Sequence, residues 1–181
     1  TQLEPERGRI RIWSRRKRKT DDWTLRAEAH VFADAFDAGS LGALPDQVRP
    51  DTIDVARFYA AADRKGYHFG PAFRGIAQIA RGPGAIRATV HLPAGHASAI
   101  DHAALDPRLL DSCLQVIIAG LDPASGDAAG TLFLPESIGR ILITGPLGTA
   151  AEVDARTNVA AEAGVGEFSL SIADASGGVR V

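Results

Sequence analysis

Alternating hydrophobic and polar residues mark two short segments near the start of the chain. In residues 9–13, Ile10 and Ile12 alternate with arginines, and in residues 23–31 every second residue is apolar. A period of two is typical of strands with one buried face. A charged stretch, residues 14–22, joins the two segments, so we expect an antiparallel hairpin with a solvated tip.

Two segments have the apolar spacing of helices. Residues 51–66 form the first, in which Asp51 is a suitable N-cap and Gly66 ends the pattern. Residues 106–120 form the second, where an Asp-Pro pair begins the helix and a glycine ends it. The second helix is apolar almost all round, which indicates that a sheet covers most of its sides.

The remaining periodic segments are short and strand-like, and Gly82-Pro83-Gly84 predicts a turn between the first two. One apolar helix among many strands predicts an α+β fold in which an antiparallel sheet wraps around a central helix. The predicted strands are residues 73–81, 85–92, 131–144 with an interruption at Pro135, 153–162, 168–174 and 177–181.

Composition narrows the class of protein. The 181 residues are 45% hydrophobic and 23% charged, which suits one globular core, and the net charge of −2 gives no field that attracts nucleic acid or membrane. The single cysteine, Cys113, rules out an internal disulfide and favours the cytoplasm. The chain contains no methionine and lacks a signal sequence at its start, so we expect a piece of a longer cytoplasmic protein.

A polar pair interrupts the long apolar helix. Asp111 and Gln115 are four residues apart, so they lie on one face, one turn from each other. The Gln115 amide can donate a hydrogen bond to the Asp111 carboxyl group and orient it. Burial disfavours the charged form of a carboxyl group, which would leave a proton available for general acid catalysis. The alternative is a structural pair that reaches water or satisfies nearby backbone.

Three segments together resemble the dehydratase domain of type I polyketide synthases. They are GYHFGPAF at residues 66–73, the Asp-x-x-x-Gln motif at residues 111–115, and Leu134-Pro135. They occur in the family's order and at plausible spacing, which is more specific than any one motif. The strand-like segments at the start of the chain resemble the last hairpin of the family's first half.

The resemblance implies a hotdog fold, a sheet wrapped around one helix, as the second half of a double hotdog. Residues 1–31 would be the last hairpin of an N-terminal hotdog, residues 32–50 a linker, and residues 51–181 the C-terminal hotdog. The implied partners are an acyl carrier protein and other polyketide synthase domains, in a homodimer, with no nucleic acid or membrane. No metal or redox cofactor is implied, and the phosphopantetheine arm arrives with the carrier protein.

The implied reaction removes water from a β-hydroxyacyl chain on the carrier protein and gives an α,β-double bond. Asp111 would be the general acid and Gln115 its orienting partner, and together they form the predicted catalytic pair. The resemblance also predicts residues that line the acyl chain's path: Tyr67, Phe69, Gly70, Pro71, Leu134 and Pro135.

The general base of the family is a histidine in an H-x-x-x-G-x-x-x-x-P motif, and none of the five histidines of this chain has that pattern. We therefore expect the base outside this chain. Three other functions share the same fold: a double-bond isomerase, a cyclase, or a non-catalytic scaffold or dimerisation domain. Cys113 is more consistent with core packing than with a nucleophile, because it lies in the middle of an apolar helix.

Overall fold

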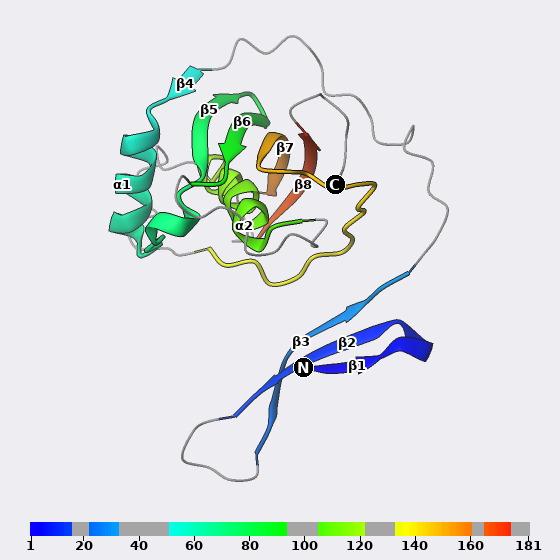
Figure 1. The fold of residues 1–181 in the computed structure, drawn as a ribbon. Coiled ribbons are helices and arrows are strands. Elements are labelled where there is room, and N and C mark those ends of the chain that lie inside the picture. The colour runs from blue at the N-terminus through cyan, green and yellow to red at the C-terminus, as the bar shows by residue number, and fades with distance from the viewer. Residues whose placement is uncertain (16–21, 33–50, 94–104, 122–132, 161–164, 175–181) are drawn as a thin grey trace. The chain divides into compact units, whose positions relative to one another are not determined.

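The computed structural model describes residues 1–15, 22–32, 51–93, 105–121, 133–160 and 165–174 (Figure 1). The chain divides into two compact units, residues 1–42 and 43–181, which are described separately here. The predicted linker from residue 33 onwards and the predicted strand at 177–181 lie outside the described residues.

The first unit is a three-stranded antiparallel sheet in the order β1-β2-β3. The predicted hairpin is confirmed as β2 (Arg9–Ser14) and β3 (Thr24–His30). The sequence pattern missed β1 (Gln2–Glu4), because three residues are too few to show a period. A 3-10 turn, η1 (Pro5–Arg7), joins β1 to β2.

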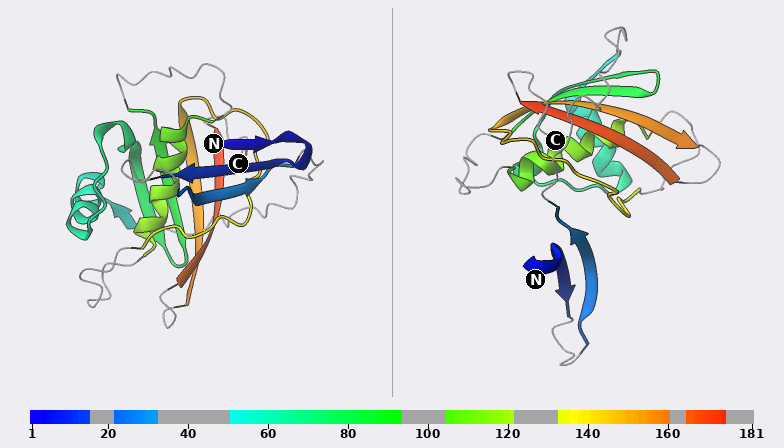
Figure 2. Two further views of the ribbon diagram at one scale, coloured as in Figure 1. Left: turned by 90° about the horizontal axis from the view of Figure 1, so that it is seen from below. Right: turned by 90° about the vertical axis from the view of Figure 1, so that its right-hand side faces the viewer.

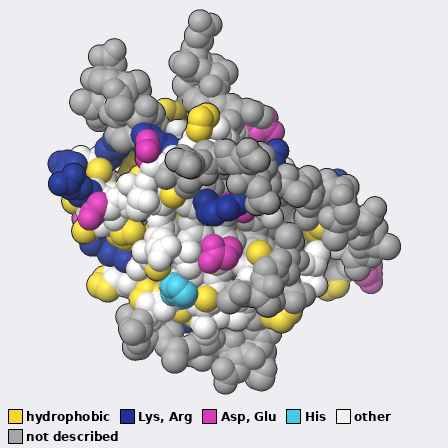
Figure 3. All heavy atoms as spheres, turned by 90° about the horizontal axis from the view of Figure 1, so that it is seen from above, with side chains coloured by type: hydrophobic (Ala, Val, Ile, Leu, Met, Phe, Trp, Pro, Cys, Tyr) yellow, Lys and Arg dark blue, Asp and Glu magenta, His cyan; other side chains and the backbone are white. Residues whose placement is uncertain are grey.

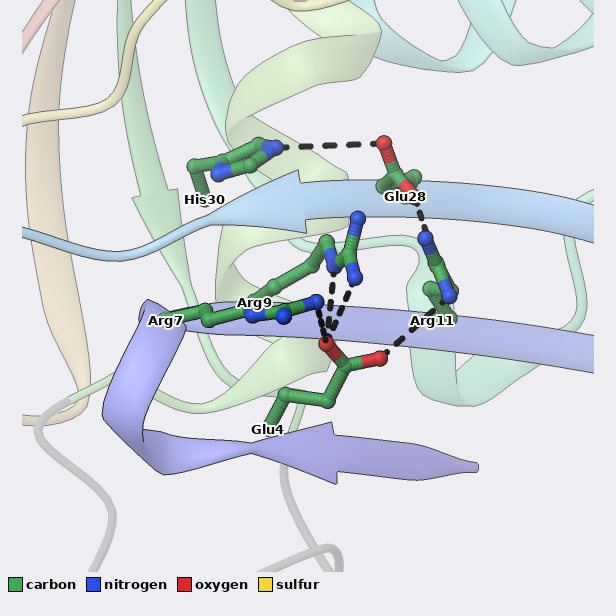
Figure 4. Close-up of polar contacts among 6 residues, drawn as sticks. All are labelled: Glu4, Arg7, Arg9, Arg11, Glu28 and His30. Carbon is green, nitrogen blue, oxygen red and sulfur yellow. Dashed lines mark hydrogen bonds and ion pairs between the residues drawn. The ribbon is translucent and has the colours of Figure 1, made fainter.

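The two faces of this small sheet differ in chemistry. Pairing of Ile10 with Ala29 and of Ile12 with Ala27 gathers apolar side chains on one face, where Ile12 remains 47% exposed. On the other face Glu4 accepts hydrogen bonds from Arg9 and Arg11, and Arg11 also donates to Glu28 (Figure 4). The hydrogen bond from Arg9 is the main reason that the pKa of Glu4 lies below its usual value.

The second unit is a five-stranded antiparallel sheet in the order β4-β5-β6-β7-β8, with α2 lying against one face (Figures 1 and 2). This arrangement confirms the predicted α+β hotdog fold. The strands are β4 (Asp51–Ile53), β5 (Ile76–Gly82), β6 (Ala85–His91), β7 (Ala150–Ala160) and β8 (Val165–Asp174). The helices are α1 (Val55–Lys65), η3 (Pro71–Phe73), α2 (Pro107–Gln115) and η4 (Val116–Ala119).

Strands β6 and β7 show how alternation builds the two faces of this sheet. Their register pairs the buried Ala88 with the buried Val153. The residues between them point outward, where the Arg87 guanidinium donates to the Asp154 carboxylate at 2.7 Å. The apolar inner face packs on α2, whose Leu109 and other inward residues are fully buried.

Helix α1 begins three residues later than predicted. Asp54 is its N-cap and accepts a hydrogen bond from the Arg57 N–H at 2.7 Å, whereas Asp51 belongs to β4. The predicted end is confirmed, because Gly66 caps the helix with φ of 99°, a left-handed conformation that favours glycine.

Helix α2 begins as predicted, with Asp106 as N-cap and Pro107 as the first helical residue. The Asp106 carboxylate accepts hydrogen bonds from the N–H and the guanidinium of Arg108, and the side-chain bond lowers the pKa of Asp106. The α-helix ends at Gln115, and the 3-10 turn η4 continues it towards Gly120.

The predicted strand at 131–144 is wrong over its described part, since residues 133–149 form neither helix nor strand. On the molecular face drawn in Figure 3, charged side chains of both signs lie among hydrophobic ones. None of the helices in the described part of the chain is long and apolar enough to cross a membrane.

Candidate active site

In the predicted polar pair, Gln115 is the last residue of α2 and Asp111 lies one turn earlier, in the middle of the helix. Gln115 Nε2 donates a hydrogen bond to Asp111 Oδ2 at 2.8 Å, as their spacing of four residues predicts. Gln115 is 3% exposed. Asp111 is only half-buried, so its carboxyl group is less enclosed than the sequence suggested. The amide is fixed inside the protein and the carboxyl group is partly accessible, which suits a group that meets a substrate.

Two segments distant in sequence complete the environment of the Gln115 amide. Its Nε2 also donates to the Phe73 carbonyl at 2.7 Å, and its Oε1 accepts a hydrogen bond from the Tyr59 hydroxyl at 3.2 Å. The Tyr59 oxygen in turn accepts from the Ile76 N–H at 3.2 Å. Tyr59 was not among the predicted site residues; the available signal was a tyrosine in an apolar helical stripe, whose buried hydroxyl needs a partner.

Gly75 allows β5 and β6 to approach α2 closely. A Cβ atom at this position would lie 2.6 Å from the His91 carbonyl oxygen and 2.7 Å from Ser112 Oγ. The His91 N–H donates to the Gly75 carbonyl at 2.8 Å, and Ser112 Oγ donates to the Phe73 carbonyl at 3.3 Å. The absence of a side chain at Gly75 therefore leaves the space that the His91 carbonyl and the Ser112 side chain occupy.

The aromatic turn after α1 connects to Phe133, the residue before the third predicted motif. The Tyr67 hydroxyl donates to the Phe133 carbonyl at 2.7 Å and accepts from the Phe133 N–H at 2.9 Å. The Tyr67 ring stacks on Phe69, with 6.1 Å between ring centroids. Both functions of this hydroxyl are therefore engaged with backbone, so Tyr67 contributes position rather than a free hydroxyl group.

The structure thus links the first two predicted motifs directly and joins the first to Phe133, which precedes the third, within the second unit. Residues 66–73 contact α2 through Phe73 and Gln115, and they contact residue 133 through Tyr67. The remaining predicted lining residues Gly70, Pro71, Leu134 and Pro135 are exposed, Leu134 by 71%.

Burial raises the pKa of two side chains in and next to this region. Burial raises the pKa of the Tyr59 hydroxyl above its usual value, so Tyr59 keeps its proton at neutral pH and can donate a hydrogen bond. Cys113 is completely buried, and burial raises its pKa to about 12, which agrees with a core residue. In the ranges that the structure describes, no three His, Cys, Asp or Glu side chains could hold a metal ion together.

Comparison with known proteins gives consistent matches. Residues 38–181 match the family model described as the polyketide synthase dehydratase N-terminal domain. A mycocerosic acid synthase-like polyketide synthase of Mycobacterium tuberculosis is 33% identical over 171 residues, which cover 86% of this chain and 8% of that protein. The phenolphthiocerol synthesis polyketide synthase Pks15/1 of Mycobacterium marinum is 28% identical over 160 residues, covering 88% of this chain and 7% of the relative.

Solved dehydratase structures share the fold. The dehydratase domain of the CurK module of curacin polyketide synthase superposes with a TM-score of 0.67 and 21% identity, over 95% of this chain and 58% of that one. A dehydratase structure from work on the borrelidin and fluvirucin synthases gives a TM-score of 0.71 and 22% identity, over 95% and 57%. The chain therefore spans under a tenth of these curated relatives and somewhat over half of these dehydratase structures. Because the matching family model is described as an N-terminal domain, it does not support the prediction of a C-terminal hotdog.

Proposed function

Because this chain belongs to the polyketide synthase dehydratase family, we propose that it supplies the proton donor for the dehydration of a β-hydroxyacyl thioester. The substrate in this proposal is carried on the phosphopantetheine arm of an acyl carrier protein. The products are an α,β-unsaturated acyl chain and water. The carrier protein and other polyketide synthase domains are the proposed partners, in a homodimer.

The hydrogen bond from Gln115 to Asp111 is the observation that carries this proposal. Gln115 Nε2 donates a hydrogen bond to Oδ2 of the Asp111 carboxyl group. When this carboxyl group is neutral, its proton is therefore on the other oxygen, Oδ1. Asp111 passes this proton to the β-hydroxyl group of the substrate, the C–O bond breaks, and the hydroxyl leaves as water. Gln115 acts through Asp111 by fixing the direction in which Oδ1 points.

A base outside this chain completes the reaction in our proposal. A histidine removes the α-proton, and the electron pair of that C–H bond forms the new double bond as water leaves. A dehydratase similar in fold supports the need for both an aspartate and a histidine. An aspartate-to-asparagine mutant and a histidine-to-phenylalanine mutant of the CurK dehydratase are both inactive, and each gives a TM-score of 0.72 with this chain.

The predicted lining residues form the proposed path of the acyl chain. Tyr67 and Phe69 offer a stacked aromatic surface that the Tyr67 hydroxyl ties to Phe133. Leu134 follows directly and is 71% exposed. Gly70 and Pro71 lie in the turn between these rings and Phe73, and a Cβ atom at Gly70 would meet no atom within 4 Å. Pro135 completes the proposed lining.

We also propose the domain organisation that the sequence suggested. Residues 51–181 form one hotdog, residues 32–50 a linker, and residues 1–31 part of another hotdog completed by residues outside this chain. The support is the apolar face of the first unit, where Leu3 is 63% and Leu25 is 42% exposed. Exposed apolar surface of this kind is stabilised when another element covers it.

The test uses a complete dehydratase domain that contains this chain, with a β-hydroxyacyl carrier protein as substrate and mass spectrometry of the product. Asp111→Asn should lower turnover by about 10²-fold or more, because the proton donor is lost. Asp51→Asn is the matched control, since it removes an exposed carboxylate in β4 and should keep full activity.

Retained turnover in Asp111→Asn would overturn the acid role, provided that thermal unfolding shows an intact fold. A product with a moved double bond or a new ring would replace dehydration with the isomerase or cyclase alternative. A complete wild-type domain that carries the histidine motif and converts no substrate would favour a scaffold.

A further inference from the structure

The side-chain amide of Gln115 has two different ends, and Tyr59 contacts only one of them. The Tyr59 hydroxyl on α1 donates to Gln115 Oε1 at 3.2 Å, although the two residues are 56 positions apart. Tyr59 is 6% exposed and Gln115 is 3% exposed, so water competes little for this hydrogen bond.

The direction of this hydrogen bond follows from the backbone of β5. The Ile76 N–H can only donate, and it donates to the Tyr59 oxygen at 3.2 Å. The Tyr59 proton is then directed to Gln115, which requires an acceptor there, namely Oε1. Nε2 at the other end faces two acceptors, the Phe73 carbonyl and Asp111 Oδ2.

We propose that Tyr59 is a positioning residue for the dehydration, because it fixes which end of the Gln115 amide meets Asp111. This inference rests on the proposed function. Without the Tyr59 hydroxyl, Oε1 loses its buried donor, and of the two anchors, this hydroxyl and the Phe73 carbonyl, only the carbonyl still favours Nε2 at the Asp111 end. In a fraction of the molecules the amide then turns so that Oε1 faces Asp111. The Asp111 proton would then be held in a hydrogen bond to Oε1 instead of being presented to the substrate's hydroxyl group.

The surroundings of Tyr59 hold its ring in place. Phe58 and Phe69 contact it edge-on, with ring centroids 5.2 and 6.3 Å away. The Arg74 guanidinium lies 5.3 Å from the ring centroid, and Asp63 fixes that guanidinium through an ion pair of 3.0 Å. Replacing only the hydroxyl, as in Tyr59→Phe, therefore keeps the ring where it is.

The experiment is a double-mutant cycle on kcat in the complete domain. Tyr59→Phe should lower kcat about fivefold with KM unchanged, and Gln115→Ala about 20-fold. If Tyr59 acts only through Gln115, adding Tyr59→Phe to Gln115→Ala should cause no further loss. Thr89→Val is the matched control, because it removes a hydroxyl that donates to Glu152 on the outward face of the sheet and has no contact with the Gln115 amide. Its kcat should stay within about twofold of wild type.

The inference would be overturned if the fold-losses in kcat of the two single variants multiplied in the double variant. An unchanged kcat in Tyr59→Phe would also overturn it. An NMR measurement tests the role of Tyr59 independently of the proposed dehydration. In Tyr59→Phe, the Gln115 side-chain amide protons should exchange with solvent at least about tenfold faster than in wild type, whether or not the domain dehydrates its substrate. Unchanged exchange would also overturn it. If Tyr59→Phe does not fold, the reverse test uses Gln115→Ala, in which the Tyr59 hydroxyl proton should exchange faster than in wild type; an equal rate counts against the inference.

Discussion

Asp111 and Gln115 lie one helical turn apart, and the hydrogen bond between Gln115 Nε2 and Asp111 Oδ2 is 2.8 Å long. The same nitrogen is anchored to the Phe73 carbonyl at 2.7 Å. One side chain therefore ties the half-buried carboxyl group of α2 to the segment that leads into β5. The orientation of the carboxyl group depends on tertiary packing as well as on the helix.

Gln115→Ala should lower kcat of the complete domain less than Asp111→Asn does. The alanine variant loses the orientation of the carboxyl group but keeps the proton donor, whereas the asparagine variant has no acidic proton to give. We expect a loss of about 20-fold against at least about 10²-fold. Steady-state kinetics on a β-hydroxyacyl carrier protein measures both. Equal losses would instead mean that Gln115 contacts the reacting atoms directly.

The catalytic pair could be predicted from sequence because its geometry is local. A spacing of four residues on a helix fixes the proximity of Asp111 and Gln115 without knowledge of the rest of the fold. The contact between Tyr59 and Gln115 could not be predicted in this way. It depends on how α1 packs beside β5, and the sequence shows Tyr59 only as one member of an apolar stripe.

Asp54→Ala should destabilise the protein by about 1 kcal/mol, because it removes the carboxylate that caps α1. Asp51→Ala is the matched control: it removes a carboxylate three positions earlier, in β4, and should change the free energy of unfolding by less than about 0.5 kcal/mol. Urea unfolding measures both variants. A larger loss of stability in Asp51→Ala than in Asp54→Ala would instead favour Asp51 as the N-cap, as the sequence pattern predicted.

Elements that depend on contacts close in sequence were also predicted better than elements that depend on distant contacts. Turn residues at 82–84 and alternation on both sides predicted the β5–β6 hairpin, because a hairpin is local, although β5 begins three residues later than predicted. Residues 133–144 have apolar residues suited to a strand, yet no described strand pairs with them. A strand requires a partner for its backbone hydrogen bonds, and sequence pattern does not show whether that partner is present.

Gly75→Ala should destabilise the fold, because the added methyl group would overlap the His91 carbonyl oxygen and Ser112 Oγ. We expect a loss of about 1–3 kcal/mol in the free energy of unfolding, as for other overpacked sites. Gly139→Ala is the matched control, since a Cβ there meets no atom within 4 Å. Thermal and urea unfolding measure both. Equal stabilities would show that β5 can move away from α2 at little cost.

Cys113 should make the stability of the protein depend on pH in the alkaline range. Burial raises the pKa of its thiol from 9.0 to about 12. Below pH 9.0 the thiol is protonated in both the folded and the unfolded state, so its contribution is fully present. Between these two pKa values the unfolded chain loses the proton while the folded protein keeps it. The free energy of unfolding should therefore fall as the pH rises, by up to about 1.4 kcal/mol per pH unit from this group.

Cys113→Ala isolates this contribution from the other groups that titrate at high pH. The variant loses packing in the core, but that loss is the same at every pH because alanine does not ionise. The stability advantage of wild type over Cys113→Ala should therefore shrink as the pH is raised above 9.0. Urea unfolding of both proteins at matched pH values measures this difference. A difference that stays constant would show that the Cys113 thiol ionises as readily in the folded protein as in the unfolded chain.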